Sequence, residues 1–144
     1  MRYYDLDESV KLFKRFLVDD DKDTENCRLQ PTLEDRAQLN WIFDNEHREG
    51  ACELRISRQQ NGYTQQFVID RTFVDQDDTR WIIDYKTSQR QPEQTESEFI
   101  QSQTEKYRSQ LENYRDLMKA TENRTTRLAL LLTDIPAVVE IEPN

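Results

Sequence analysis

An acid and a lysine lie two residues apart at the end of an apolar run, Trp81-Ile82-Ile83-Asp84-Tyr85-Lys86. In a β-strand the side chains of residues i and i+2 project from the same face, so Asp84 and Lys86 are predicted to point the same way. A second carboxylate, Asp70, lies fourteen residues before Asp84 in another β-rich run, Val68-Ile69-Asp70-Arg71. Two carboxylates and an ammonium at one sheet edge can bind a hard divalent cation and hydrolyse a phosphodiester.

These residue types suit Mg²⁺, with Mn²⁺ as a substitute. Mg²⁺ keeps several waters, so Asp70, Asp84 and one backbone carbonyl suffice as protein ligands, and the carbonyl of Tyr85 is the natural third. Lys86 would orient a metal-bound water or neutralise charge developing on the phosphate. The alternative is that Asp-x-Lys is a solvated pair at a strand end. The apolar neighbours of both acids argue against that alternative, because an unpaired buried carboxylate is costly.

Other polar and aromatic residues are weaker candidates. Gln110 lies about 60° from Tyr107 around a helix, at the flank of its apolar stripe. Tyr107 and Tyr114 are either core aromatics or contacts to substrate. Arg71 either pairs with a carboxylate or touches a phosphate. His47, the single histidine, is in a polar stretch and is predicted to be a surface residue.

Periodic patterns predict the elements that position these residues. Cys52, Leu54 and Ile56 alternate with polar residues in a half-buried strand that starts at Ala51, and Asn61-Gly62 predicts a hairpin turn after it. The predicted helices lie at about 5–18, 32–43 and 97–119, and the further strands at about 63–74, 80–86, 124–133 and 137–141.

The predicted fold class is α/β (α+β mixed), with an antiparallel meander of three strands and extra N-terminal helices. The long helix crosses over to a buried parallel strand, because the unbroken apolar run at 128–132 suits a strand covered on both faces. Pro136 limits the last strand to a sheet edge. Residues 1–50 are predicted to form a helical segment packed on a core at 51–144, within a single domain.

Composition excludes several classes of function. No apolar stretch reaches the roughly 20 residues of a membrane span, and no signal peptide is recognisable, so a cytoplasmic location is expected. Cys27 and Cys52 are expected to be free thiols. The chain has no Gly-rich phosphate loop, so it encodes no ATP site. The net charge of −9 is unusual for a protein that grips DNA unaided, so another domain or subunit is expected to hold the substrate.

The chain resembles the PD-(D/E)xK nuclease superfamily, specifically the C-terminal nuclease of RecB/AddA-type helicase–nucleases (exonuclease V beta-subunit relatives). The resemblance rests on three segments in order: Phe67-Val68-Ile69-Asp70-Arg71, then Trp81-Ile82-Ile83-Asp84-Tyr85-Lys86-Thr87, then Tyr107-Arg108-Ser109-Gln110-Leu111-Glu112-Asn113-Tyr114. It implies that Asp70 and Asp84 are metal ligands, that Lys86 is the catalytic lysine, and that Gln110 and Tyr114 form the family's helix motif.

The resemblance also implies a restriction-endonuclease-like core and a larger helicase–nuclease that unwinds and digests DNA in double-strand break repair. The partners would be DNA, the helicase domains of the same polypeptide and a second subunit, and this chain would be a C-terminal fragment. The chain departs from the family in lacking the histidine of an N-terminal helix, and in having Phe67 where a loop glycine often precedes the metal-binding Asp. Two other functions therefore stay open: a nuclease-fold scaffold without cleavage, and a stand-alone acidic adaptor.

Overall fold

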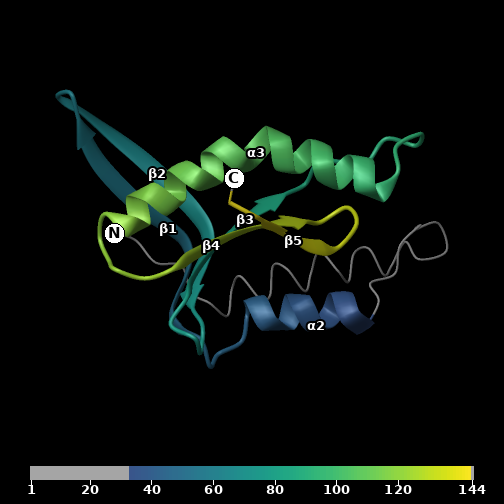
Figure 1. The fold of residues 1–144 in the computed structure, drawn as a ribbon, viewed down its shortest axis with the longest axis horizontal. Helices are drawn as coiled ribbons and strands as arrows, with labels where there is room; N and C mark the ends of the chain where they lie inside the picture. The colour runs from purple at the N-terminus through teal and green to yellow at the C-terminus, as the bar shows by residue number, and fades with distance from the viewer. Residues whose placement is uncertain (1–32, 144) are drawn as a thin grey trace.

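The computed structural model describes residues 33–143, in which one mixed sheet lies between two helices (Figure 1). The helix predicted at 5–18, and Cys27, lie outside the described residues. The elements are α2 (Leu33–Ile42), β1 (Arg48–Gln60), β2 (Tyr63–Val74), β3 (Arg80–Lys86), α3 (Glu96–Lys119), β4 (Thr126–Leu132) and β5 (Ala137–Ile141). The predicted mixed α/β class is therefore confirmed. The predicted division at residue 50 stays a prediction, although β1 already begins at Arg48.

The strand order of the sheet is the order of the chain, β1-β2-β3-β4-β5. Neighbouring strands are antiparallel except for β3 and β4, which are parallel and are joined through α3. A parallel pair needs such a crossover connection, so the meander and the crossover predicted from the sequence are both confirmed. α3 covers one face of the sheet and α2 the other (Figure 1), and β5 is the edge strand that Pro136 predicted.

The core is divided by the sheet into two clusters. β4 shows this most clearly, because Leu128, Leu130 and Leu132 belong to the cluster under α3, whereas Ala129 and Leu131 belong to the cluster under α2. All five are buried. The continuous apolar run is thus explained by a strand with two covered faces.

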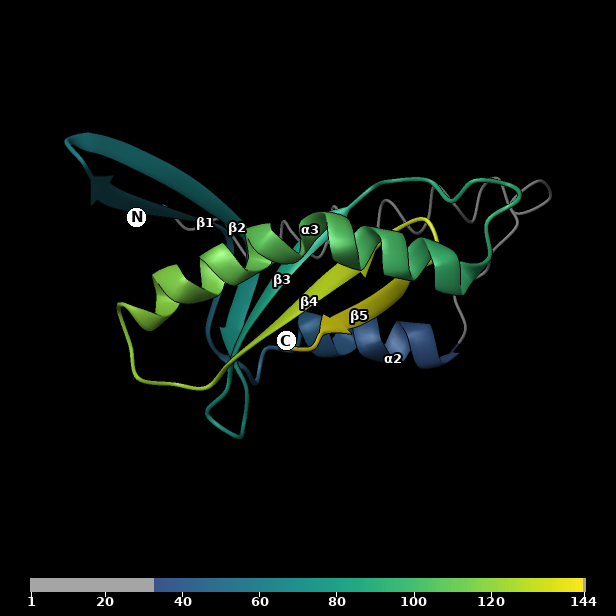
Figure 2. The ribbon, with the colours of Figure 1, turned by 45° about the horizontal axis from the view of Figure 1, so that its top comes forward.

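β1 and β2 form a long hairpin closed by Asn61 and Gly62, whose φ angles of 53° and 80° are those of the left-handed turn that this dipeptide favours. The distal half of the hairpin projects beyond the sheet (Figure 2). It projects because β2 pairs with β3 only from Arg71 to Val74, whereas its pairing with β1 continues to Gln60↔Tyr63.

The alternation predicted for β1 changes phase at Glu53, which has a left-handed φ of 48°. Ala51 and Leu54, three residues apart, both belong to the α3-side cluster, which a regular strand of period two does not allow. Cys52 instead contacts Arg71 on the other face. The prediction that Cys52 shares a face with Leu54 and Ile56 was therefore wrong, because an irregular residue re-aims the strand.

α3 begins where Thr95 caps it. The Thr95 hydroxyl accepts a hydrogen bond from the Glu98 amide at 3.1 Å and donates one to the Glu98 carboxylate at 3.1 Å. This reciprocal contact satisfies a backbone donor that the first turn would otherwise leave free. The helix buries Phe99, Gln103, Leu111, Tyr114, Leu117 and Met118 against the sheet. Within residues 33–143, neither helix has the length and apolar character that crossing a membrane requires.

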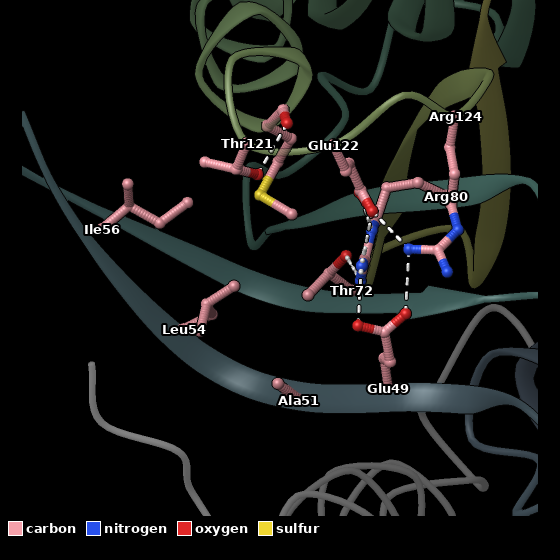
Figure 3. Close-up of a pocket in the computed structure, with 10 residues that line it drawn as sticks. Glu49, Ala51, Leu54, Ile56, Thr72, Arg80, Thr121, Glu122 and Arg124 are labelled. Atoms are coloured by element: carbon pink, nitrogen blue, oxygen red, sulfur yellow. Dashed lines mark hydrogen bonds and ion pairs between the residues drawn. The ribbon is translucent and has the colours of Figure 1, made fainter.

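An ion-pair network lies at the end of the sheet where β3 begins. Arg80, whose side chain is 5% exposed, donates hydrogen bonds of 2.7 and 3.1 Å to the two carboxylate oxygens of Glu122. Arg124 joins Glu122 to Glu49 (Figure 3). These charged groups border a cleft of about 370 Å³ whose apolar wall includes Leu54, Ile56 and Met118.

Glu122 is expected to make stability depend on acidity. Hydrogen bonds from Arg80, with Arg124 in addition, lower the pKa of Glu122 from its usual 4.5 in spite of partial burial. The carboxylate therefore contributes stability above about pH 4.5 and loses it as the pH falls through the lowered folded-state pKa. Glu122→Gln should cost about 2 kcal/mol at neutral pH, and the difference from wild type should narrow below about pH 4.

Chemical denaturation at several pH values measures the free energy of unfolding of Glu122→Gln and wild type. The control is Glu93→Gln, which changes an exposed residue of the linker ahead of α3. A destabilisation by Glu122→Gln that stays constant down to acidic pH would contradict the assigned role.

Candidate active site

The pairing of β2 with β3 brings the two predicted acids together. The register runs Thr72↔Ile82 and Arg71↔Ile83, so one step further along it Asp70 stands opposite Asp84. The two carboxyl groups lie within hydrogen-bonding distance of each other. An incidental Asp-x-Lys, as in the stand-alone adaptor, predicts that the two acids point apart, and in this structure they do not.

Asp70 lies where the strand pairing stops. Its Oδ2 accepts a hydrogen bond of 2.8 Å from the backbone amide of Tyr85. Burial, together with the hydrogen bond and the charge of Asp84, raises the pKa of Asp70 to about 7, against the lowering effects of the Tyr85 amide and Lys86. Two carboxylates forced side by side share a proton in this way unless a cation neutralises them.

Lys86 supplies a positive charge beside this pair. Its Nζ is 2.7 Å from Asp84 Oδ2, and Asp84 itself is only 4% exposed. Burial tends to lower the pKa of Lys86, but its contact with Asp84 and the nearby negative charges outweigh that effect and raise it. Lys86 is therefore a protonated donor, and it cannot act as a general base in this arrangement.

α3 adds an amide and two rings to the site. Gln110 bridges the lysine and a tyrosine, because its Oε1 is 3.4 Å from Lys86 Nζ while its Nε2 donates a 2.8 Å hydrogen bond to the Tyr114 hydroxyl. The Lys86 ammonium also lies 4.0 Å from the centre of the Tyr107 ring, a cation–π contact. The helix motif and the Asp-x-Lys strand thus form one hydrogen-bonded and ion-paired cluster.

The two carboxylates fit a divalent cation. Asp84 Oδ2 is buried, and the single ammonium of Lys86 beside it balances only one of the two carboxylates, so a divalent cation would neutralise the remaining negative charge. Within the same residues no group of three or more His, Cys, Asp or Glu gathers. Such a donor set suits Mg²⁺ or Mn²⁺, which complete their shells with water and a carbonyl, and does not suit a closed zinc site.

Tyr85 contributes its backbone and not its side chain. Its ring lies on the α2 side of the sheet, 6.4 Å from the Phe43 ring, and burial raises the pKa of its hydroxyl. A metal-ligand role for the Tyr85 carbonyl stays a prediction.

Arg71 lies away from the acids, and its expected substrate contact is corrected. Its side chain is 0% exposed; Nε donates a 3.0 Å hydrogen bond to the Ile42 carbonyl, and the guanidinium packs over the rings of Phe43 and Phe73. Adjacent residues of a strand face opposite ways, so Asp70 on the α3 side sends Arg71 to the α2 side.

His47 also differs from the prediction of a surface residue. Its Nε2 lies 2.6 Å from the Trp41 carbonyl, and its ring stacks on Phe73 at 4.0 Å between centroids. Phe73 belongs to the cluster under α2. His47 therefore packs on the face opposite the acids.

Two residues beside the site were not predicted from the sequence. The Phe67 ring meets the Tyr114 ring edge-on at 6.2 Å, and a Ser88 hydrogen bond lowers the pKa of Tyr107. Phe67 precedes Asp70 by three residues and Ser88 follows Lys86 by two. The signal in the sequence was that both residues lie close to Asp70 or Lys86. The face that Phe67 occupies could not be predicted, because the alternation of the hairpin changes at Glu53 on the paired strand.

Paired carboxylates with a lysine at the end of a sheet define a candidate site for metal-assisted phosphodiester hydrolysis. The model of the PD-(D/E)XK nuclease superfamily matches residues 5–142, and the chain belongs to this superfamily. Members of the superfamily are generally nucleolytic and usually use divalent metal ions. None of the curated proteins compared with the chain matches it.

Divalent cations should stabilise the chain through Asp84. A cation at one hundred times its dissociation constant adds about 2.7 kcal/mol to a protein that binds it only when folded. We expect Mg²⁺ or Mn²⁺ to raise the melting temperature of the wild type, and Asp84→Asn to abolish this rise. Asp116→Asn, on the exposed side of α3, is the matched control. An equal metal-induced shift in Asp84→Asn and wild type would exclude this site.

Arg71→Lys tests the corrected position of Arg71. A lysine cannot hold the Ile42 carbonyl and cover two rings at once, so the substitution should lower the free energy of unfolding by about 2 kcal/mol and leave nucleic-acid binding unchanged. Denaturation and fluorescence anisotropy with a labelled oligonucleotide measure the two effects. Weaker binding at unchanged stability would restore the substrate-contact hypothesis.

Proposed function

We propose that the chain is a Mg²⁺-dependent deoxyribonuclease domain that hydrolyses phosphodiester bonds as an exonuclease. The observation that carries this proposal is the cluster of Asp70, Asp84 and Lys86, in which a half-buried and a buried carboxylate lie together beside a protonated amine. Membership of the superfamily supports nuclease chemistry in general. The Mg²⁺ dependence, the cleavage of DNA from an end of the strand and the roles of the individual residues are our inference.

Each residue of the cluster has a distinct task in this proposal. Asp70 and Asp84, with the Tyr85 carbonyl, would hold the cation, which supplies a water of lowered pKa and an electrophile for the phosphate oxygens. Lys86, kept protonated by Asp84, donates a hydrogen bond toward the phosphate and offsets its developing charge.

α3 fixes the position of the ammonium in this proposal. Gln110, itself bonded to Tyr114, contacts the ammonium from α3, and the Tyr107 ring of the same helix lies 4.0 Å from it. Tyr107 also offers its ring surface to the substrate, whereas the expected substrate contact of Tyr114 is not supported, because Tyr114 is only 6% exposed and instead holds Gln110.

We further propose that the chain works within an ATP-dependent helicase–nuclease in double-strand break repair and recombination, in the cytoplasm. This context rests on the RecB/AddA-like order of its motifs. Net charge supports the need for other parts, because a chain of net charge −9 attracts DNA poorly. Helicase domains of the same polypeptide, and a second subunit, would then bring the DNA to the site.

The same acidity favours a second candidate function, a nuclease-fold scaffold that binds proteins and cuts nothing. The histidine that the family places on an N-terminal helix is also missing from residues 5–18, and His47 does not lie on that predicted helix. The intact set of Asp70, Asp84 and Lys86 disfavours this alternative, since a scaffold gains nothing from two carboxylates held in contact.

A cleavage assay on labelled DNA separates the two functions. We expect Mg²⁺-dependent release of mononucleotides or short products from linear DNA, little cutting of circular DNA, and no activity in EDTA. Lys86→Ala should lower the rate roughly a hundredfold or more, because it removes a preorganised charge at the phosphate. Lys119→Ala, at the far end of α3, is the matched control and should keep the wild-type rate.

Equal rates for Lys86→Ala and wild type would assign the activity to a contaminant or to another site. No cleavage by the wild type, either alone or joined to its helicase domains, would favour the scaffold.

A further inference from the structure

The distal half of the β1–β2 hairpin, residues 54–69, is here called the arm. It contains no Asp or Glu between Glu53 and Asp70 but carries Arg55 and Arg58, in a chain of net charge −9. Six residue pairs extend it from Arg55↔Val68 to Gln60↔Tyr63, a reach of about 20 Å. Figure 2 shows it projecting away from the rest of the sheet. The arm is thus a positively charged ribbon on an acidic molecule.

The two faces of the arm differ. Strand alternation puts Ile56, Arg58, Phe67, Gln65 and Tyr63 on one face and Arg55, Ser57, Gln59, Thr64, Gln66 and Val68 on the other. The first face is the one on the α3 side, because Ile56 and Phe67 pack against the α3-side cluster. On it, the Arg58 guanidinium lies 5.4 Å from the centre of the Phe67 ring, and Tyr63 near the tip is 76% exposed.

No carboxylate of the described residues pairs with Arg58. Within residues 33–143 its guanidinium donates two hydrogen bonds, of 3.2 and 2.7 Å, and both go to the neutral amide oxygen of Gln65. Other arginines of the described residues, such as Arg80, Arg124 and Arg127, pair with carboxylates instead. Arg58 therefore keeps a charge available for a phosphate.

This face is continuous with the candidate active site. Tyr114 bonds to Gln110 of the site on one side and meets the Phe67 ring on the other, and Arg58 covers Phe67. A line of side chains therefore leads from the acids through Tyr114, Phe67 and Arg58 to Tyr63. The line contains three aromatic rings and one guanidinium group.

We propose that the arm binds a single strand of DNA that passes out of the active site along this line. The inference rests on the proposed function. Single strands are bound by cations that follow the phosphates and by aromatic rings on which bases stack, and both are present on this face. A duplex is the poorer fit, because its bases are already stacked and unavailable to Tyr63. Asp84 is also only 4% exposed, and a flexible single strand can approach a buried carboxylate more closely than a rigid duplex can.

Binding without cleavage tests the arm directly. Fluorescence anisotropy of a labelled single-stranded oligonucleotide is measured with the 144-residue chain in EDTA at low salt, over a salt series. We expect the double variant Arg58→Gln, Tyr63→Ala to bind roughly tenfold more weakly or worse, with a salt slope smaller by about 0.7. The matched control Arg55→Gln, Val68→Ala removes one charge and one exposed apolar side chain from the opposite face, and should bind within about twofold of the wild type.

Three outcomes would overturn the inference: no binding by the wild type, equal affinity of both double variants, or tighter arm-dependent binding of duplex than of single strand. Mg²⁺-dependent cleavage is measured in parallel. Cleavage by the wild type with no effect of the arm substitutions would refute the arm and leave the nuclease intact. Arm-dependent binding without any cleavage would support the arm and refute the nuclease. Circular dichroism of each variant confirms that the hairpin is still folded.

Discussion

Two carboxylates in contact at the end of the β2–β3 pairing are the constraint on which this structure depends. Like charges this close repel each other, and burial adds to the cost, which is why the pKa of Asp70 rises to about 7. The surrounding fold must hold them there against that repulsion. The register of β2 with β3 on one side, and the parallel ladder of β3 with the apolar β4 on the other, provide the rigidity.

The cluster around the acids explains why α3 is part of the site and not only a cover for the sheet. Lys86 compensates Asp84 from the same strand, but a lysine has a flexible stem that does not hold its own position. Gln110 and the Tyr107 ring contact its ammonium from α3. α3, which shares a core cluster with β4 through Leu111, thereby helps to position a charge that is carried by β3.

The sequence predicted those elements whose local signals agree with their tertiary surroundings. The Asn61-Gly62 turn, the apolar β4 run and the amphipathic α3 each have a local sequence pattern that agrees with their environment in the fold. Prediction failed where one residue interrupted the alternation: Glu53 takes a left-handed φ, so Cys52 lies on the opposite face of β1 from Leu54 and Ile56. Arg71 was predictable, since its neighbour Asp70 already determined its face, whereas the aromatic packing of His47 depends on contacts distant in sequence.

The negative net charge of the chain is compatible with nucleic-acid binding, because binding depends on the local charge at the contact surface more than on the total charge. The negative groups at the start of β3, such as Glu122 and Glu49, are engaged with Arg80 and Arg124, so their field is largely cancelled there. The arm, in contrast, contains no acid, and among the described residues the guanidinium of Arg58 hydrogen-bonds to the amide of Gln65 and to no carboxylate. At moderate salt, charges more than about 10 Å away are screened. A strand near the arm therefore experiences the local positive charge more strongly than the distant net charge of the chain.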